Sequence, residues 1–344
     1  MSKRLIVCCD GTWNTPDQQQ NGKPSPTNVT KVKRAIAPRD RHGMEQRVSY
    51  HKGVGTTRWE RIRGGAFGFG LSRDVRNAYR FLVDNYEPGD ELFFFGFSRG
   101  AFTARSTVGF VRNSGILRPD EVGRLDEAFA LYRSRSKAPR SPEAELFRKQ
   151  FSFESRIRFI GVWDTVGALG IPLNGLRWVN AINRRDQFHD TELSSTVDSA
   201  FQGLAINEKR KAFIPAIWHP KPDAVSQQLR QVWFAGVHSD VGGGYLESEL
   251  SDIALCWMTK QARLCGLAFN HEGPGLDPAW ATGPIHESRT GFFRLLRPYR
   301  RPIGVTDPAH EVAASTAVQR LEGGGYAPEN LVKYLNGDHQ VEQL

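Results

Sequence analysis

The chain has 344 residues, of which 39% are hydrophobic and 24% charged, as in an ordinary globular protein. Its 46 lysines and arginines outnumber 37 aspartates and glutamates, an excess that suits an anionic partner without choosing among phosphate esters, lipid surfaces and nucleic acids. No apolar run reaches the roughly 18–20 residues that cross a bilayer, and the run at residues 5–9 is too short for a signal peptide, so we expect a cytoplasmic protein or one secreted without a signal.

The first half of the chain alternates strand-like and helix-like segments. "RLIVCC" at residues 4–9 ends at "DGT" and predicts a buried strand followed by a turn. A polar loop at 17–28 leads to a helix within 27–37, capped by Thr27 or Asn28. Residues 47–53 alternate as a strand does, and a glycine-rich stretch at 64–70 precedes a helix at 71–86.

The apolar runs that follow predict the centre of a parallel sheet. "ELFFFGF", beginning at residue 91, is apolar on both faces, and 156–167 and 231–245 contain similar β-branched and aromatic runs. Strand-like and helix-like segments in alternation predict an α/β-hydrolase-like fold, with a mostly parallel central sheet and helices on both faces. We expect a single domain over 1–344, with helical insertions near 115–155 and 171–230. The second insertion contains no clear strand pattern, and we interpret it as a lid.

One short motif predicts a nucleophile. Gly96, Ser98 and Gly100 match the G-x-S-x-G elbow, in which a serine occupies a sharp turn between a strand and a helix. The turn is crowded, so the positions two residues away must lack side chains. It also aims the first N–H groups of the helix, beginning with that of Arg99, at the oxygen that becomes negative in acyl transfer.

A serine nucleophile needs a base, and the base needs an acid that orients it. α/β-Hydrolases carry these groups in the order Ser, Asp or Glu, His, and here Ser98 is followed by Asp164 and His238, each at the end of a strand-like run. His286 and His310 are alternatives for the base because they also follow Asp164 in the chain. We favour His238 because glycines beside it would let a substrate approach.

The loop "CDGTWN" offers the second N–H group for the oxyanion, from Gly11 or Thr12, with Asp10 as the residue that holds the loop. Asp240 is a further supporting residue near the site, although a structural role in a turn is the simpler interpretation. "DGT" also occurs in phosphatases with an aspartate nucleophile, but Cys8 stands where that aspartate would be. The four cysteines lack the spacing of a zinc site or a disulfide framework, and we expect no metal and no cofactor.

The chain as a whole resembles the DUF2235 family, α/β-hydrolase domains that include the catalytic domain of Tle1-like phospholipase effectors of the type VI secretion system. The resemblance depends on "CCDGTWN", "TNV", "AYRFLVDNYEPGDELFFFGFSRGAFTAR", "FIGVWDTVG", "WFAGVHSDVGGGY" and "YAPENL", which together span nearly the whole chain. It implies a triad of Ser98, Asp164 and His238, and ester hydrolysis with phospholipids as the substrate class. The segment "AASTAVQR" departs from the family pattern, which has a histidine before the residue equivalent to Arg320.

We therefore expect a serine esterase, similar to phospholipases, that acts on a lipid or another ester. The segment 287–302 contains five arginines among aromatic and aliphatic residues, so it could contact an anionic membrane surface or pack on the core with its arginines in water. No nucleic-acid-binding module is visible. The alternative is a lipid-binding or regulatory protein that keeps the hydrolase fold without catalysis, and the oligomeric state is left open.

Overall fold

The computed structural model describes residues 2–12, 14–53, 67–134, 138–167, 192–221, 224, 226–270, 276–337 and 340–344. Within them, one large sheet has eight strands in the order β12-β11-β10-β9-β8-β5-β1-β4, and every pair of neighbours is parallel. Its strands are β1 (Arg4–Cys9), β4 (Gln46–His51), β5 (Glu91–Phe97), β8 (Ile157–Trp163), β9 (Val197–Ala205), β10 (Gln228–Phe234), β11 (Glu311–Ala314) and β12 (Val341–Glu342).

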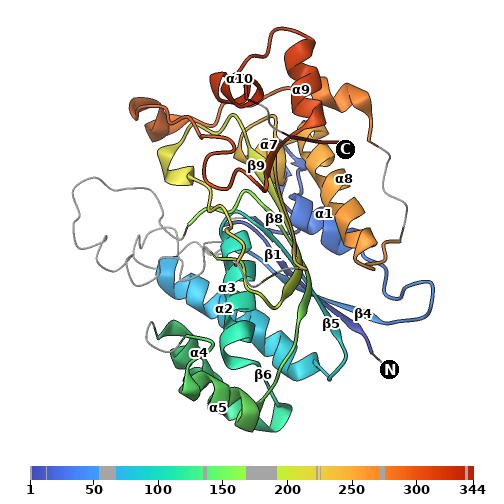
Figure 1. The fold of residues 1–344 in the computed structure, drawn as a ribbon. Helices are drawn as coiled ribbons and strands as arrows, with labels where there is room; N and C mark the ends of the chain where they lie inside the picture. Colours follow the sequence, from blue (N-terminus) through green and yellow to red (C-terminus); the bar gives the residue numbers. More distant parts are fainter. Residues whose placement is uncertain are drawn as a thin grey trace.

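Helices cover both faces of this sheet (Figure 1). On one face lie α2 (Phe67–Asn85), α3 (Arg99–Ser114), α4 (Leu125–Arg133) and α5 (Pro142–Phe151). On the other lie α1 (Asn28–Ala35), α8 (Glu249–Leu264), α9 (Ser315–Glu322) and α10 (Glu329–Leu335). The short helix α7 (His238–Gly242) follows β10 directly. The predicted α/β fold with a parallel sheet between helices is confirmed.

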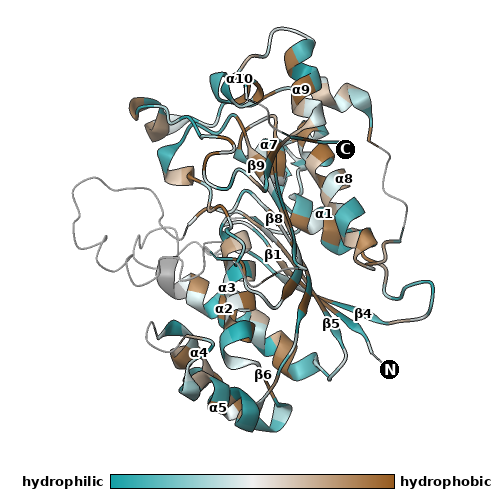
Figure 2. Cartoon of the chain, viewed as in Figure 1, coloured by the Kyte–Doolittle hydropathy of each residue, from teal (hydrophilic) through white to brown (hydrophobic). Residues whose placement is uncertain are grey.

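Each face of the sheet has its own hydrophobic core because the side chains of a strand alternate between faces. Cys8 packs with the core beneath α1 and α8, and its neighbour Cys9 packs with the core beneath α2 and α3. Both thiols are buried and free. Figure 2 shows hydrophobic colours along the central strands and mixed colours along the helices around them. Burial on both sides is what gives β1 and β5 their uninterrupted apolar sequences.

The predicted cap of the first helix agrees with the structure. Thr27 is the N-cap of α1, and its side chain accepts a hydrogen bond from the N–H of Thr30. In the region 115–155 the chain forms α4, α5, the 3₁₀ helix η1 (Pro119–Arg124) and a small ribbon of β6 (Ile116–Leu117) and β7 (Ser152–Phe153). No described helix is long and apolar enough to cross a membrane.

The region 171–230 differs from expectation. It contains β9, which pairs with β8 and β10 in the middle of the sheet. The polar residues Asp198, Ser199 and Gln202 interrupt its apolar pattern, and the burial of Gln202 is compensated by hydrogen bonds to Thr165 and Gln231. Of the predicted lid, residues 171–191, 222, 223 and 225 lie outside the described residues.

Candidate active site

Ser98 lies at the turn between β5 and α3. Its φ of 58° is in the left-handed region, which non-glycine residues rarely adopt. Its N–H donates to the carbonyl oxygen of Trp163 on β8 at 3.0 Å, which extends the pairing of Phe97 with Trp163 by one residue. The side chain is 6% exposed. A strained serine at the carboxyl end of a central strand is the geometry that the elbow motif predicts.

Three glycines leave the space in which this turn forms. A Cβ at Gly96 would lie 2.5 Å from the Cα of Ala101, and one at Gly100 would lie 2.2 Å from the carbonyl oxygen of Cys9. A Cβ at Gly11 would lie 3.3 Å from the Cβ of Ser98. The first turn of α3 and the loop after β1 therefore touch each other at the serine.

Asp164 and His238 meet beside this turn. Asp164 follows β8, the neighbour of β5, and its Oδ2 lies 2.5 Å from Nδ1 of His238 at the start of α7. Asp164 is fully buried, and His238 is 5% exposed. The imidazole packs against the rings of Phe97 and Phe213, with centroids 4.7 and 4.9 Å apart. Within the described residues, no hydrogen bond joins the hydroxyl of Ser98 to His238.

A fourth residue, Arg301, completes the buried cluster and was not expected from the sequence. Its Nη1 donates to Asp164 Oδ1 at 2.6 Å and its Nη2 to Asp164 Oδ2 at 3.0 Å. The backbone N–H of Ala205, at the end of β9, donates to Asp164 Oδ1 at 3.1 Å. The carboxylate thus has partners on both oxygens. Arg301 belongs to the basic segment 287–302, and no local pattern distinguishes it from the other four arginines there.

The buried charges shift the acidity of the pair. Burial alone would raise the pKa of Asp164, but the charge of Arg301 and the contact with His238 outweigh it and hold that pKa well below its usual range. Burial lowers the pKa of His238, although Asp164 and Glu208 oppose this. The carboxylate is therefore ionised and the imidazole neutral at pH 7, which are the states a general base and its orienting acid require.

Asp10 fixes the loop that follows β1. Its carboxylate is 2% exposed and accepts hydrogen bonds from Thr27, Thr30 and Tyr50 at 2.6, 3.0 and 2.7 Å. It also accepts one from the N–H of Gly11 at 2.7 Å. Burial raises the pKa of Asp10, and these hydrogen bonds oppose the shift. The carboxylate thus joins β1, α1 and β4 at one point.

The other candidate histidines have different partners. His286 Nδ1 lies 2.6 Å from Asp240 Oδ1, and the ring stacks on Tyr245 with centroids 3.9 Å apart. Asp240 also accepts the N–H of Val237, so it supports the turn that leads into α7. His310 Nδ1 lies 2.9 Å from an oxygen of Asp307, three residues earlier in the chain. Of the three histidines, His238 is the one bonded to Asp164.

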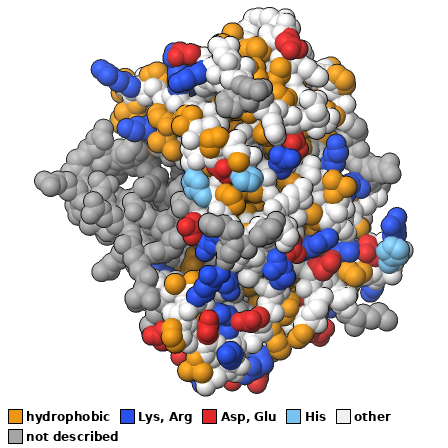
Figure 3. All heavy atoms as spheres, viewed as in Figure 1, with side chains coloured by type: hydrophobic (Ala, Val, Ile, Leu, Met, Phe, Trp, Pro, Cys, Tyr) orange, Lys and Arg blue, Asp and Glu red, His pale blue; other side chains and the backbone are white. Residues whose placement is uncertain are grey.

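A row of aromatic rings connects the site to the surface. Phe213, which packs on His238, lies with its centroid 6.2 Å from that of Phe293, and Phe293 lies 6.5 Å from Phe292. Phe292 is 55% exposed and Leu295 is 82% exposed, both on the 3₁₀ helix η4 (Gly291–Leu295). Near the middle of the face drawn in Figure 3, histidine side chains lie beside hydrophobic ones, with Lys and Arg side chains around them, whereas a histidine at the right-hand edge lies among charged side chains.

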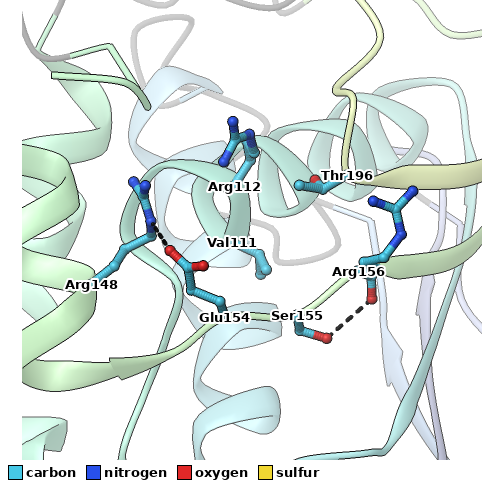
Figure 4. A pocket seen from close by; sticks show the side chains of 7 residues that line it. All are labelled: Val111, Arg112, Arg148, Glu154, Ser155, Arg156 and Thr196. Atoms are coloured by element: carbon cyan, nitrogen blue, oxygen red, sulfur yellow. Dashed lines mark hydrogen bonds and ion pairs between the residues drawn. The ribbon is translucent and has the colours of Figure 1, made fainter. Parts of the chain in front are cut away.

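A separate hollow of about 260 Å³ lies at the other end of the central strands, near the amino ends of β8 and β9 (Figure 4). Its charged lining includes Arg148, paired with Glu154 at 2.8 Å, and Arg156, whose partner Asp198 is 2.6 Å away. The hollow contains none of the predicted catalytic residues, and two of its positive charges are compensated.

Comparison with known proteins gives one family and several distant relatives. The family described as the catalytic domain of Tle1-like phospholipase effectors of the type VI secretion system matches residues 3–261. The uncharacterized protein YEL023C of Saccharomyces cerevisiae is 28% identical over an alignment of 245 residues, which covers 64% of this chain and 33% of the yeast protein.

Two solved structures are similar at low identity. An uncharacterized protein from Pseudomonas aeruginosa is 18% identical, with a TM-score of 0.47 over 84% of this chain and 48% of its own. The Tle1 effector bound to the VgrG spike is 21% identical, with a TM-score of 0.36 over 71% and 51%. The chain thus spans about a third of the yeast relative and about half of each solved chain.

Proposed function

The chain belongs to the family of Tle1-like phospholipase effector catalytic domains, the DUF2235 family, and from this premise we propose that it is a serine hydrolase of carboxylic esters. The observation that carries the proposal is the buried hydrogen bond between His238 and Asp164. Asp164 follows β8, and β8 pairs with β5, the strand that leads to Ser98. An acid, a base and a nucleophile are the three groups that the triad mechanism of acyl transfer uses.

In the proposed reaction, Ser98 Oγ attacks the ester carbonyl carbon while its proton passes to Nε2 of His238. Asp164 holds the imidazole through Nδ1 and stabilises the imidazolium. The bond between the carbonyl carbon and the leaving oxygen then breaks, and His238 gives its proton to the departing alcohol. Water attacks the acyl-enzyme in the second half, His238 accepts the water's proton, and the acid leaves as Ser98 regains its hydrogen.

The oxyanion needs donors near the serine. We assign one to the N–H of Arg99, which opens α3, because the first N–H groups of a helix point out of its end. The N–H of Gly11 already donates to Asp10, so we assign the second to Thr12, the next residue in a loop that touches Ser98. The role of Asp10 is to hold this loop in place.

For the substrate class we propose a lipid ester, in keeping with the family, delivered at an anionic membrane surface. Phe292 and Leu295 present exposed apolar side chains on a segment with arginines, and the row of rings behind them ends at His238. Replacing both with aspartate should lower binding to phosphatidylglycerol vesicles at least about tenfold, since each buried apolar side chain contributes about 1.5–3 kcal/mol. The matched control is Leu264→Asp, at a residue 74% exposed at the end of α8; equal binding by both variants would contradict a specific docking surface.

A fluorophosphonate probe tests the chemistry without knowledge of the substrate. We expect the folded protein to be labelled covalently and Ser98→Ala to abolish labelling. Ser155→Ala, just before the amino end of β8, should leave labelling unchanged. A panel of short-chain and phospholipid esters, compared between wild type and Ser98→Ala, then defines the substrate. Folded wild-type protein that takes no label would favour the alternative, a lipid-binding protein without catalysis.

A further inference from the structure

We propose that Arg301 is a positioning residue of the catalytic centre: it holds the carboxylate of Asp164 at two points and limits how strongly that carboxylate stabilises a proton on His238. The inference rests on the proposed function, which it deepens by giving the triad a fourth member. Neither the motifs of the sequence nor the spacing of its strand ends indicated this residue.

The contact is bidentate and fully buried. Nη1 and Nη2 of Arg301 each reach a different oxygen of Asp164, at 2.6 and 3.0 Å, and both side chains are 0% exposed. Two parallel N–H···O bonds fix the plane of a carboxylate as well as its position. Since Oδ2 also contacts Nδ1 of His238, fixing that plane fixes the direction in which the imidazole points.

Arg301 is itself held from three sides. Its Nη1 donates to the carbonyl oxygen of Ala205 at 3.0 Å, and its Nη2 donates to that of Phe213. The side-chain amide of Asn330, in α10, donates to the carbonyl oxygen of Arg301 at 3.0 Å. The guanidinium is therefore preorganised by β9 and by the 3₁₀ helix Lys211–Phe213, and α10 holds the backbone of Arg301, so the side chain does not have to move to reach the acid.

The charges around His238 are balanced. Two carboxylates contact His238. Asp164 lies at Nδ1 of the ring, and Glu208 Oε2 accepts a hydrogen bond from the backbone N–H of His238 at 3.3 Å. Two guanidinium groups oppose them, Arg301 on Asp164 and Arg210 on Glu208. The carboxylate on the helix of His238 itself, that of Asp240, is hydrogen-bonded to His286. Each carboxylate near His238 therefore has a partner of its own.

An imidazolium in these surroundings gains less from Asp164 than it would from a carboxylate without a cation. The positive charge of Arg301 repels the proton that His238 takes up, and the low dielectric of a buried site strengthens the repulsion. The base is therefore kept neutral to lower pH than in a triad without the arginine. The same contact supplies the orientation that lets a weaker base act, because a fixed imidazole needs no reorganisation during proton transfer.

The test measures the rate of fluorophosphonate labelling of Ser98 against pH, in wild type and in the variants Arg301→Met and Arg301→Lys. We expect Arg301→Met to lower the maximal rate about 10- to 10²-fold, less than the roughly 10⁴-fold loss of an orienting acid. We expect it also to move the acid limb of the profile upward by about one pH unit. Arg301→Lys, which keeps the charge but not the fork, should lower the rate and leave the limb within about 0.3 pH unit of wild type.

Arg300→Met is the matched control, since Arg300 is the neighbouring arginine, 68% exposed and paired with Glu329 at the surface; its rate and limb should equal those of wild type. If Arg301→Met does not fold, Arg301→Lys decides: a reduced rate with an unmoved limb supports the proposal, and a wild-type rate overturns it. A folded Arg301→Met with a wild-type limb also overturns it, since an ion pair that serves only stability would leave the pH profile in place. Wild type that takes no label refutes the hydrolase proposal itself, which separates the two failures.

Discussion

Removing the carboxylate of Asp164 should destabilise the fold as well as stop catalysis. In Asp164→Asn the shape of the side chain is kept, but one oxygen becomes an NH₂ group that cannot accept from Arg301 or His238. Arg301 then remains buried with a full charge and no anion, and breaking a buried pair from one side costs about 3–5 kcal/mol. That is a large part of the 5–15 kcal/mol that stabilises a typical domain.

A double-mutant cycle separates this effect from a general loss of packing. Asp164→Asn and Arg301→Met each leave one partner without its counter-charge, whereas the double variant leaves neither. We therefore expect the double variant to lose about 2–3 kcal/mol less than the sum of the single losses. The measurement is urea unfolding at pH 7.5, followed by tryptophan fluorescence and far-UV circular dichroism, with coincidence of the two signals as the check for two-state behaviour.

The surface pair of Arg300 and Glu329 provides the reference for that cycle. Both side chains are about two-thirds exposed, so Arg300→Met should change the free energy of unfolding by less than about 1 kcal/mol. A loss below about 1 kcal/mol for Asp164→Asn, or losses that add fully in the double variant, would refute the reasoning that the pair is held by mutual compensation of buried charge.

Three further predictions concern the elbow, the base and the loop. Gly100→Ala should lower the free energy of unfolding by at least about 2–3 kcal/mol and abolish labelling, because the new Cβ would meet the backbone after β1; Gly123→Ala, with open space around it, should change it by less than about 0.5 kcal/mol. Burial lowers the pKa of His238 in the folded chain, so the stability that the neutral imidazole supports is present above the unfolded pKa near 6.5 and is lost as pH falls through the folded pKa. The acid limb of labelling should likewise lie below pH 6.5, and a limb at pH 7 or above would contradict this prediction. Tyr50→Phe removes one of four hydrogen bonds to the buried carboxylate of Asp10, and urea unfolding should show a loss of about 1.5–3 kcal/mol, an unchanged midpoint being the contrary result.

The features visible in the sequence are those encoded by neighbouring residues. A strand buried on both faces produces a continuous apolar run, so β1, β5, β8 and β10 could be recognised, and the reactive residues follow such runs directly. Crowding at the turn leaves glycines at 96 and 100, where a Cβ would collide with backbone. These signals are local, which is why a single chain displays them.

The features that the sequence did not reveal depend on distant partners. The sequence of β9 lacks a continuous apolar run because Ser199 and Gln202 interrupt it. The hydrogen bonds that offset the burial of Gln202 involve Gln231, on the adjacent strand, and Thr165. Arg301 lies 137 residues after Asp164 in an arginine-rich segment. Only the folded chain distinguishes this buried guanidinium from its exposed neighbours, since composition records the charge and not its depth.

The two residues with left-handed φ at the ends of β5 and β8 are Ser98, at 58°, and Asp164, at 41°. Each such conformation costs about 1–3 kcal/mol in a residue that has a Cβ, and glycine would adopt it at little cost. Selection for durability alone would favour glycine at position 98, and a Ser98→Gly protein should survive heating better than its parent. Under the proposed function, the strain at position 98 is the energetic cost of holding a hydroxyl at the end of β5.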